Sequence, residues 1–224
     1  MNYLIGVDLG TSGTKTVLFD TEGTVISSAT VEYPRYQPKT GWAEQAPEDW
    51  WDATMRTTKK VIEDSGVDSK DIKGMGISGQ MHGLVALDET DAVLRPAILW
   101  NDGRTAEETA WLNDTVGRPV LSTRTGNIAF AGFTAPKLLW MKKHEPELFA
   151  RIRKIMLPKD YLVYCLTGVH ATDYSDASGM LLLDVEHKCW SRDMLALCGI
   201  SESQMPRLYE SFAPVGTLLP ETAA

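Results

Sequence analysis

Two short hydrophobic runs, separated by small and polar residues, begin the chain. The first run covers residues 3–7 and is followed by Asp8, and the second covers 16–19 and is followed by Asp20. The intervening turn at 10–13 is rich in glycine and hydroxyl side chains. Two strand-like runs joined in this way predict a β-hairpin with a carboxylate at the end of each strand.

The pattern then changes to helical spacing and returns to strands. After a third expected strand at 25–31, Pro47 and two acidic residues begin a helix that carries Trp50 and Trp51. We interpret the two tryptophans as core residues, with a sugar-stacking platform as the alternative. Further strands are expected at 73–78, 84–87, 97–100 and 181–184, and further helices at 105–113, at 137–144 and from 145, 157 and 193. This order predicts an α/β fold of the RNase H-like type, a mixed sheet with flanking helices and an inserted helical segment.

Composition and charge narrow the function. The 224 residues are 43% hydrophobic and 23% charged, as in ordinary globular proteins. A net charge of −8 without a basic block argues against nucleic-acid binding, although local backbone amides could still hold phosphates. Three widely spaced cysteines fit reduced thiols, and neither a signal peptide nor a membrane-spanning run is visible, so a cytoplasmic protein that does not enter membranes is expected.

The first hairpin carries the leading candidate chemistry. Asp8 at a strand end, beside hydroxyl and amide donors, could hold hydrated Mg²⁺ against a nucleotide phosphate. Glycines at the tip would let backbone N–H groups approach the phosphate. An ordinary tight turn with a solvated aspartate is the alternative interpretation, and Lys15 is as compatible with a solvated strand lysine as with a phosphate contact.

Polar residues after two later strands are candidate sugar contacts. Met81 and His82 lie between Gly79 and Gly83, which favours close approach of a ligand; a packed histidine is the alternative. Trp100 and Asp102 follow the next strand. The carboxylate of Asp102 could accept two sugar hydroxyls or could cap the helix at Thr105, and both interpretations stay open. Gln80 is expected to orient the loop.

Two further polar segments are interpreted as structural. In GWAEQ at 41–45, Trp42 is expected to pack and Glu44 to hold the loop. Asp173 and Asp176 lie in a hydroxyl- and acid-rich loop at 172–179, which we interpret as an acidic turn rather than a metal pair.

The motifs occur in a specific order: DLGTSGTK at 8–15, GWAEQ at 41–45, GQMHG at 79–83, WNDGR at 100–104, FTAPKLLW at 133–140 and LPKDY at 157–161. In combination they closely resemble the FGGY family of carbohydrate kinases over essentially the whole chain. GQMHG and WNDGR are most similar to the family members that phosphorylate D-xylulose.

The resemblance implies an actin/hexokinase/Hsp70-type domain of a kinase that uses ATP and Mg²⁺ to convert D-xylulose to D-xylulose 5-phosphate. Asp8 would be the essential carboxylate on the metal side. The implied phosphate contacts are Gly10, Thr11, Ser12, Gly13, Thr14 and Lys15, and the implied sugar contacts are Gln80, Met81, His82, Trp100 and Asp102. Other FGGY specificities (ribulose, gluconate, glycerol) and a non-catalytic actin- or Hsp70-like nucleotide-binding domain remain as alternatives.

One departure from the family pattern concerns the reaction itself. Family members carry a second actin-like domain, which supplies most of the ATP contacts and the general-base aspartate. The resemblance places both beyond residue 224, so residues 1–224 are expected to be the amino-terminal, sugar-binding domain. The partners expected are the sugar, ATP and that carboxy-terminal domain, with a homodimer left open. The isolated segment is expected to have no appreciable turnover.

Overall fold

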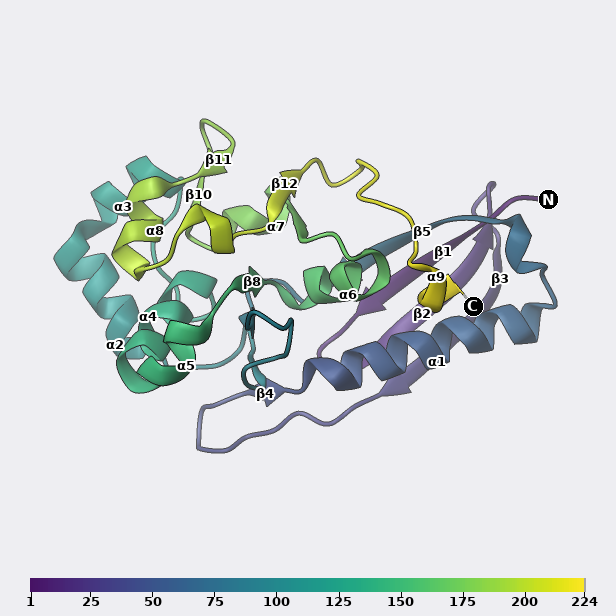
Figure 1. Ribbon diagram of the computed structural model, residues 1–224, viewed down its shortest axis with the longest axis horizontal. Coiled ribbons are helices and arrows are strands. Elements are labelled where there is room, and N and C mark those ends of the chain that lie inside the picture. Colours follow the sequence, from purple (N-terminus) through teal and green to yellow (C-terminus); the bar gives the residue numbers. More distant parts are fainter. Residues whose placement is uncertain (224) are drawn as a thin grey trace. The chain divides into compact units, whose positions relative to one another are not determined.

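The computed structural model describes residues 1–223, which form two compact units (Figure 1). The first unit combines Met1–Arg35 with Ala46–Gln80. The second combines Tyr36–Gln45 with the chain from Met81 onward. Within the described residues, every helix is too short or too polar to cross a bilayer.

A four-stranded sheet in the order β3-β2-β1-β5 forms the first unit. Its elements are β1 (Tyr3–Leu9), β2 (Gly13–Asp20), β3 (Val25–Glu32), α1 (Pro47–Ser65), a 3₁₀ turn (Ser69–Asp71) and β5 (Ile72–Gly79). The first three strands form an antiparallel meander, and β5 pairs with β1 in parallel. The predicted hairpin, third strand and following helix are therefore confirmed.

Alternation along the strands decides which face of the sheet α1 covers. Thr16 on β2 and Thr57 on α1 share a buried hydrogen bond of 2.7 Å, so the side chain of Thr16 faces α1. Val7 on β1 lies opposite Thr16 in the strand register and points to the same face. Asp8 therefore projects from the other face. Trp50 on α1 is fully buried, so its interpretation as a core residue is confirmed. Proline in the first turn and Gly66, in the left-handed conformation at φ 67°, mark the two ends of α1.

Short strands and helices around one hydrophobic cluster make up the second unit. The strands are β4 (Glu44–Gln45), β6 (Val85–Leu87), β7 (Ala97–Ile98), β8 (Lys154–Met156), β9 (Ala171–Asp173), β10 (Leu183–Asp184), β11 (Cys189–Trp190) and β12 (Arg207–Tyr209). The helices are α2 (Ala106–Ala110), α3 (Arg118–Thr125), α4 (Thr134–His144), α5 (Pro146–Arg151), α6 (Pro158–Thr167), α7 (Tyr174–Ser178), α8 (Arg192–Cys198) and α9 (Pro220–Ala223), with a π-helix at Trp111–Gly117 and a 3₁₀ turn at Glu202–Gln204.

The second unit also corrects three predictions about local structure. The expected loop at 172–179 is wrong: it contains the end of β9 and the short helix α7, because the side chain of Asp173 accepts from the backbone N–H of Asp176 and caps that helix. The helix expected at 105–113 continues as a π-helix to Gly117. The helix α3 follows it and was not predicted from the pattern.

Candidate functional site

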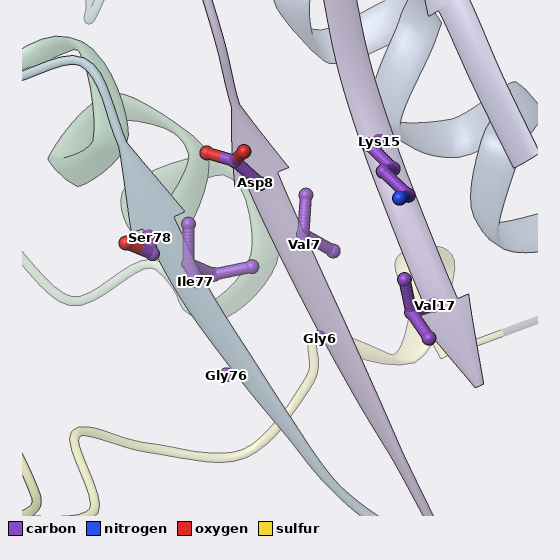
Figure 2. A pocket seen from close by; sticks show the side chains of 8 residues that line it. All are labelled: Gly6, Val7, Asp8, Lys15, Val17, Gly76, Ile77 and Ser78. Atoms are coloured by element: carbon purple, nitrogen blue, oxygen red, sulfur yellow. The ribbon is translucent and has the colours of Figure 1, made fainter. Parts of the chain in front are cut away.

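Asp8 lies at the edge of a shallow pocket of about 430 Å³ on the sheet of the first unit. It is opposite Lys15 on β2 and Ser78 on β5 in the strand register. Figure 2 shows these three side chains on neighbouring strands, with apolar side chains and glycines lining the rest of the pocket. The carboxylate is exposed and makes no hydrogen bond or ion pair within residues 1–223, so its oxygens are available to a ligand.

Close contacts within the chain explain the glycines of the turn between β1 and β2. A Cβ on Gly10 would lie 2.9 Å from the carbonyl oxygen of Gly13, and one on Gly13 would lie 2.7 Å from that of Val31. The Gly10 N–H donates to the Gly13 carbonyl over 3.0 Å. The turn is therefore built around glycine before any phosphate is considered.

Gln80 braces this turn from the end of β5. Its backbone N–H donates to the carbonyl of Leu9 over 2.7 Å, and its side-chain amide donates to the carbonyl of Gly10 over 3.1 Å. The Tyr33 hydroxyl donates to the same Gly10 carbonyl. Burial, with the charge of Asp8 adding to it, raises the pKa of Tyr33 to about 12, so this donor stays protonated at neutral pH. These contacts tie Gln80 to the β1–β2 turn. The expectation that it orients the 79–83 loop stays a prediction.

The other candidate sugar residues lie in the second unit, where three chain segments meet. An antiparallel bridge between Leu84 and Ile98 brings the segment that contains His82 beside the one that contains Trp100. The Thr134 hydroxyl donates to the His82 carbonyl over 3.0 Å. Met81 and Trp100 are each about two-fifths exposed, at 39% and 44%, so they remain available to a ligand.

The glycines on either side of this loop do not provide open space. A Cβ on Gly79 would overlap the backbone of Leu9, and Gly79 has a φ of 142°. A Cβ on Gly83 would lie 2.7 Å from Cγ of Pro158. Close packing of the chain itself therefore requires these glycines, and close approach of a ligand at this loop stays a prediction.

His82 has an enclosed and positively charged environment. Its ring centroid lies 4.9 Å from that of Phe133, and it is half-buried. Burial, and after it the charge of Lys137, lowers the pKa of His82, while the charge of Asp176 opposes the shift. The imidazole is therefore neutral at pH 7 and has one N–H to donate and one nitrogen to accept.

A titration of the imidazole by ¹⁵N NMR should accordingly show a midpoint for His82 below the ordinary value of 6.5. Because the unfolded chain takes up this proton more readily, the unfolding free energy should fall as the pH drops from 6.5 through the folded midpoint. Lys137→Met should raise the midpoint, since it removes the neighbouring charge. A wild-type midpoint at or above 6.5 would contradict this description of the site.

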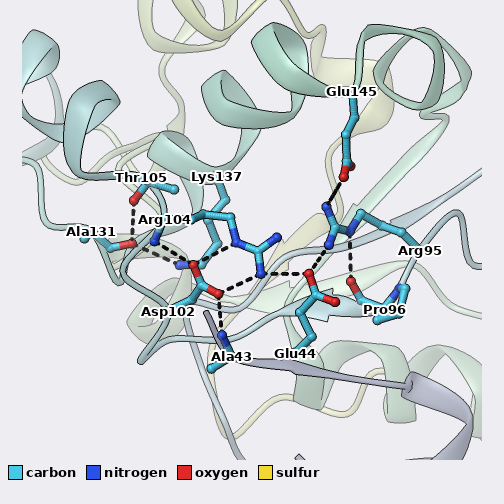
Figure 3. A network of polar contacts seen from close by, with 10 residues as sticks. All are labelled: Ala43, Glu44, Arg95, Pro96, Asp102, Arg104, Thr105, Ala131, Lys137 and Glu145. Carbon is cyan, nitrogen blue, oxygen red and sulfur yellow. Dashed lines mark hydrogen bonds and ion pairs between the residues drawn. The ribbon is translucent and has the colours of Figure 1, made fainter. Parts of the chain in front are cut away.

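Asp102 is at the centre of a buried polar network (Figure 3). It accepts from the backbone N–H of Ala43 and, at 2.8 and 2.7 Å, from the guanidinium of Arg104. Glu44 pairs with both Arg104 and Arg95. Thr105, the residue before α2, makes no side-chain cap hydrogen bond, and the backbone N–H that Asp102 accepts from, over 2.8 Å, belongs to Arg104, outside the helix. The alternative that Asp102 caps α2 is therefore wrong. The Asp102 side chain has 0% of its surface exposed, so the structure leaves this carboxylate no surface open to a sugar.

The structural interpretation of the GWAEQ segment is confirmed. The Arg104 guanidinium lies 3.8 Å from the centroid of the Trp42 ring, and Trp140 contacts that ring edge-on. Glu44 pairs with two arginines, as described above. These contacts hold the 41–45 segment against the second unit's core.

A second buried network surrounds Lys159. Its ammonium lies 2.7 Å from carboxylate oxygens of Asp160 and Asp173 and 3.2 Å from one of Asp176. Burial alone would lower the pKa of Lys159, but the charges of Asp160 and Asp176 outweigh it and raise the pKa. The two aspartates of the acidic segment thus pair with a lysine, and no cluster of metal-binding side chains occurs among residues 1–223.

Sequence reasoning missed three residues that organise these sites. Lys137 is fully buried and donates to the carbonyls of Ala131, Gly132 and Phe133. Burial lowers its pKa to about 7. The other two, Arg104 and Lys159, were quoted only as letters of motifs, and no spacing rule connects them with their distant partners.

The residues of the first unit fit a magnesium–nucleotide ligand. Mg²⁺ usually keeps several waters and takes one or two carboxylates together with substrate phosphates. Asp8 is an available carboxylate, and the turn before β2 carries the hydroxyl side chains of Thr11 and Ser12.

The mixed sheet of the first unit, with α1 packed on one face, has the actin/hexokinase-like architecture of the sugar kinases that the chain resembles. Residues 3–224 match the amino-terminal domain of the FGGY family of carbohydrate kinases. The chain belongs to this family.

Individual relatives agree with this assignment. The chain is 49% identical over 219 residues to the xylulose kinase of Escherichia coli K12, covering 98% of this chain and 44% of the relative. A solved structure from Brucella ovis, described as a "xyloylose kinase", matches with a TM-score of 0.94 at 43% identity, over 98% of this chain and 46% of that one. The gluconate kinase of Lactobacillus acidophilus has a TM-score of 0.93 at 28% identity, with coverages of 99% and 44%. The chain thus spans a little under half the length of these proteins.

Proposed function

We propose that this chain is the sugar-binding, amino-terminal domain of a kinase that transfers the γ-phosphoryl group of ATP to D-xylulose and forms D-xylulose 5-phosphate. The observation that carries the proposal is the exposed Asp8 carboxylate, which has no internal partner within residues 1–223 and lies beside a turn built around glycine. The similarity to a xylulose kinase at 49% identity supports the choice of sugar.

The fold does not choose among sugars, because a gluconate kinase matches it nearly as well as the Brucella protein does. The proposal for D-xylulose therefore depends on the residues of the second unit. Met81 and Trp100 offer exposed apolar surface, and His82 offers a neutral donor and acceptor. Such a mixed surface suits a short polyol that has a carbon face and a row of hydroxyls.

In the proposed reaction the protein forms no covalent bond with the phosphoryl group. Its contribution to catalysis is to position the substrates and to neutralise charge. Asp8 would hold Mg²⁺, which supplies charge neutralisation at the phosphates when it is bound. Donors of the 10–15 turn would bind phosphate oxygens, with Gln80 and Tyr33 fixing the turn through the Gly10 carbonyl. His82 would hold a sugar hydroxyl. The base that removes the proton of the attacking hydroxyl is proposed to lie in a carboxy-terminal ATP-binding domain.

A panel of ketoses and polyols tests the choice of sugar. The complete kinase, assayed with ATP and Mg²⁺, should have its highest kcat/KM with D-xylulose, ahead of ribulose, gluconate and glycerol. A preference for any of the other three would reassign the substrate within the family. Absence of phosphorylation with every member of the panel would overturn the kinase proposal itself.

The purified 224-residue chain should show no appreciable ATP-dependent phosphorylation of D-xylulose, because the proposed base and most of the proposed ATP contacts are not among its residues. Formation of ADP in a coupled assay, with and without the sugar, measures this. The complete kinase under the same conditions is the positive control. Robust turnover by the 224-residue chain would show that the catalytic groups are all present within it.

A further inference from the structure

Gly179, the residue after α7, lies directly against the imidazole of His82. A Cβ built on Gly179 would overlap Cε1 and Nδ1 of that ring. The backbone at this position does not itself require glycine, because Gly179 has an ordinary helical conformation with φ −83° and ψ −1°. The ring of His82 is therefore the reason for a residue without a side chain here.

Both sides of this contact are held in place independently. His82 has a φ of 63°, which is unusual for a residue with a side chain, and the Thr134 hydroxyl bonds to its carbonyl. On the other side, the backbone N–H of Ala135 donates to the carbonyl of Met180 over 3.0 Å. The start of α4 thus fastens both the histidine loop and the residue next to Gly179.

The ring is consequently confined between two surfaces. The ring of Phe133, just before α4, contacts the imidazole with a centroid distance of 4.9 Å. Gly179 lies against the Cε1 and Nδ1 atoms of the imidazole. Lys159 holds α7 through Asp173 and Asp176, so Gly179 cannot readily retreat from the ring. The space at position 179 therefore fixes how deeply the imidazole lies in the second unit.

We propose that Gly179 is a positioning residue that determines sugar binding by leaving the space in which the His82 imidazole lies. Any side chain at 179 displaces the ring from this place, and with it the proposed sugar contact. This inference rests on the proposed function, in which His82 contacts the sugar. It adds a residue about a hundred positions distant that makes no sugar contact of its own.

Gly179→Ala tests the proposal in two ways. In the 224-residue chain, the ¹⁵N resonances of the His82 imidazole should shift and its titration midpoint should change, because displacement alters both the burial of the ring and its hydrogen bond to the Gly179 backbone. His82→Ala identifies the resonance among the four histidines. The matched control is Gly74→Ala on β5, whose Cβ would meet only Cδ2 of Leu4, at 3.4 Å, and should leave the His82 signals unchanged.

Kinetics of the complete kinase provide the second readout. Gly179→Ala should lower kcat/KM for D-xylulose by about tenfold or more, chiefly through KM, which corresponds to about 1.4 kcal/mol. In the His82→Ala background the same substitution should change kcat/KM less than twofold, because no ring remains to be displaced. Equal losses in both backgrounds, or unshifted His82 resonances in Gly179→Ala, would overturn the inference.

The outcomes separate this inference from the function on which it rests. If His82→Ala leaves kcat/KM for D-xylulose unchanged, the proposed sugar contact is wrong even where the NMR shift in Gly179→Ala shows that the glycine positions the ring. If Gly179→Ala fails to fold, the double variant with His82→Ala should fold, since the overlap is removed. Failure of both to fold would overturn the inference, because the space would then serve more than the ring.

Discussion

Replacing Asp8 with asparagine in the complete kinase should lower kcat by about 10²-fold or more, at least ~2.7 kcal/mol of transition-state stabilisation. The substitution keeps the size of the side chain but removes the negative charge that would hold Mg²⁺ beside the phosphates. Steady-state assays with D-xylulose, at several magnesium concentrations, measure the effect. Little change in stability should accompany it, because the carboxylate is exposed and has no internal partner within residues 1–223.

Asp20→Asn is the matched control for this experiment. Asp20 ends the second strand of the same hairpin, and its carboxylate accepts from the backbone N–H groups of Glu22 and Thr24, both at 2.9 Å. An asparagine oxygen can accept these bonds too, so kcat should stay within about twofold of wild type. An unchanged kcat in Asp8→Asn, or equal losses in both variants, would show that the charge of Asp8 is not what the reaction uses.

Lys159→Met should lower the free energy of unfolding by about 3–5 kcal/mol, because it removes the cation of a buried ion-pair network. The methionine fills a similar volume but leaves three carboxylates, from Asp160, Asp173 and Asp176, without the ammonium that now pairs with them. Two of these carboxylates are partly or fully buried close to one another, so their repulsion is weakly screened. Urea denaturation at pH 7 measures the free energy of unfolding.

The loss should become smaller at acid pH. Without the lysine, the folded-state pKa values of the aspartates rise above their unfolded values, so protonation relieves the repulsion as the pH falls. Lys60→Met is the control: its pair with Asp64 is exposed, with side chains 61% and 49% accessible, and it should cost less than about 1 kcal/mol. A loss in Lys159→Met no greater than in this control would mean that the buried network contributes little.

Local patterns were sufficient for the first unit. The alternation along 3–20, the turn between the two strands and the proline that begins α1 are each encoded within a few residues. The parallel pairing of β5 with β1 follows from the same α/β order. The position of Asp8 at the exposed end of β1 was therefore predictable, because strand alternation and the following turn both fix it.

The polar networks of the second unit could not be predicted in the same way. Glu44 meets Arg95 and Arg104, which lie more than fifty positions later, and sequence spacing carries no signal for such pairs. The burial of Lys137 was not predictable either, since a lysine on an amphipathic helix is usually solvated. Its burial is favourable here only because a neighbouring turn offers three carbonyl acceptors, those of residues 131–133.

Glycine was the residue type for which sequence reasoning was least specific. The notion that glycines admit a ligand applied equally to positions 10, 13, 79 and 83, yet each has a different neighbour within the chain. The need for glycine at position 179 could not be predicted, because the side chain that requires it belongs to His82, almost a hundred residues earlier. Only the fold reveals which side chain a glycine accommodates.

The interleaving of the two units has a consequence for dissecting the protein. The polypeptide passes from one unit to the other after Arg35, Gln45 and Gln80, so each unit is assembled from two separate stretches. No single proteolytic cut can release either unit as one continuous peptide. Expressing the sheet unit by itself would require Arg35 to be joined to Ala46 through a new linker. Co-translational folding of that sheet must likewise wait until β5 has left the ribosome, because its partner β1 is made some seventy residues earlier.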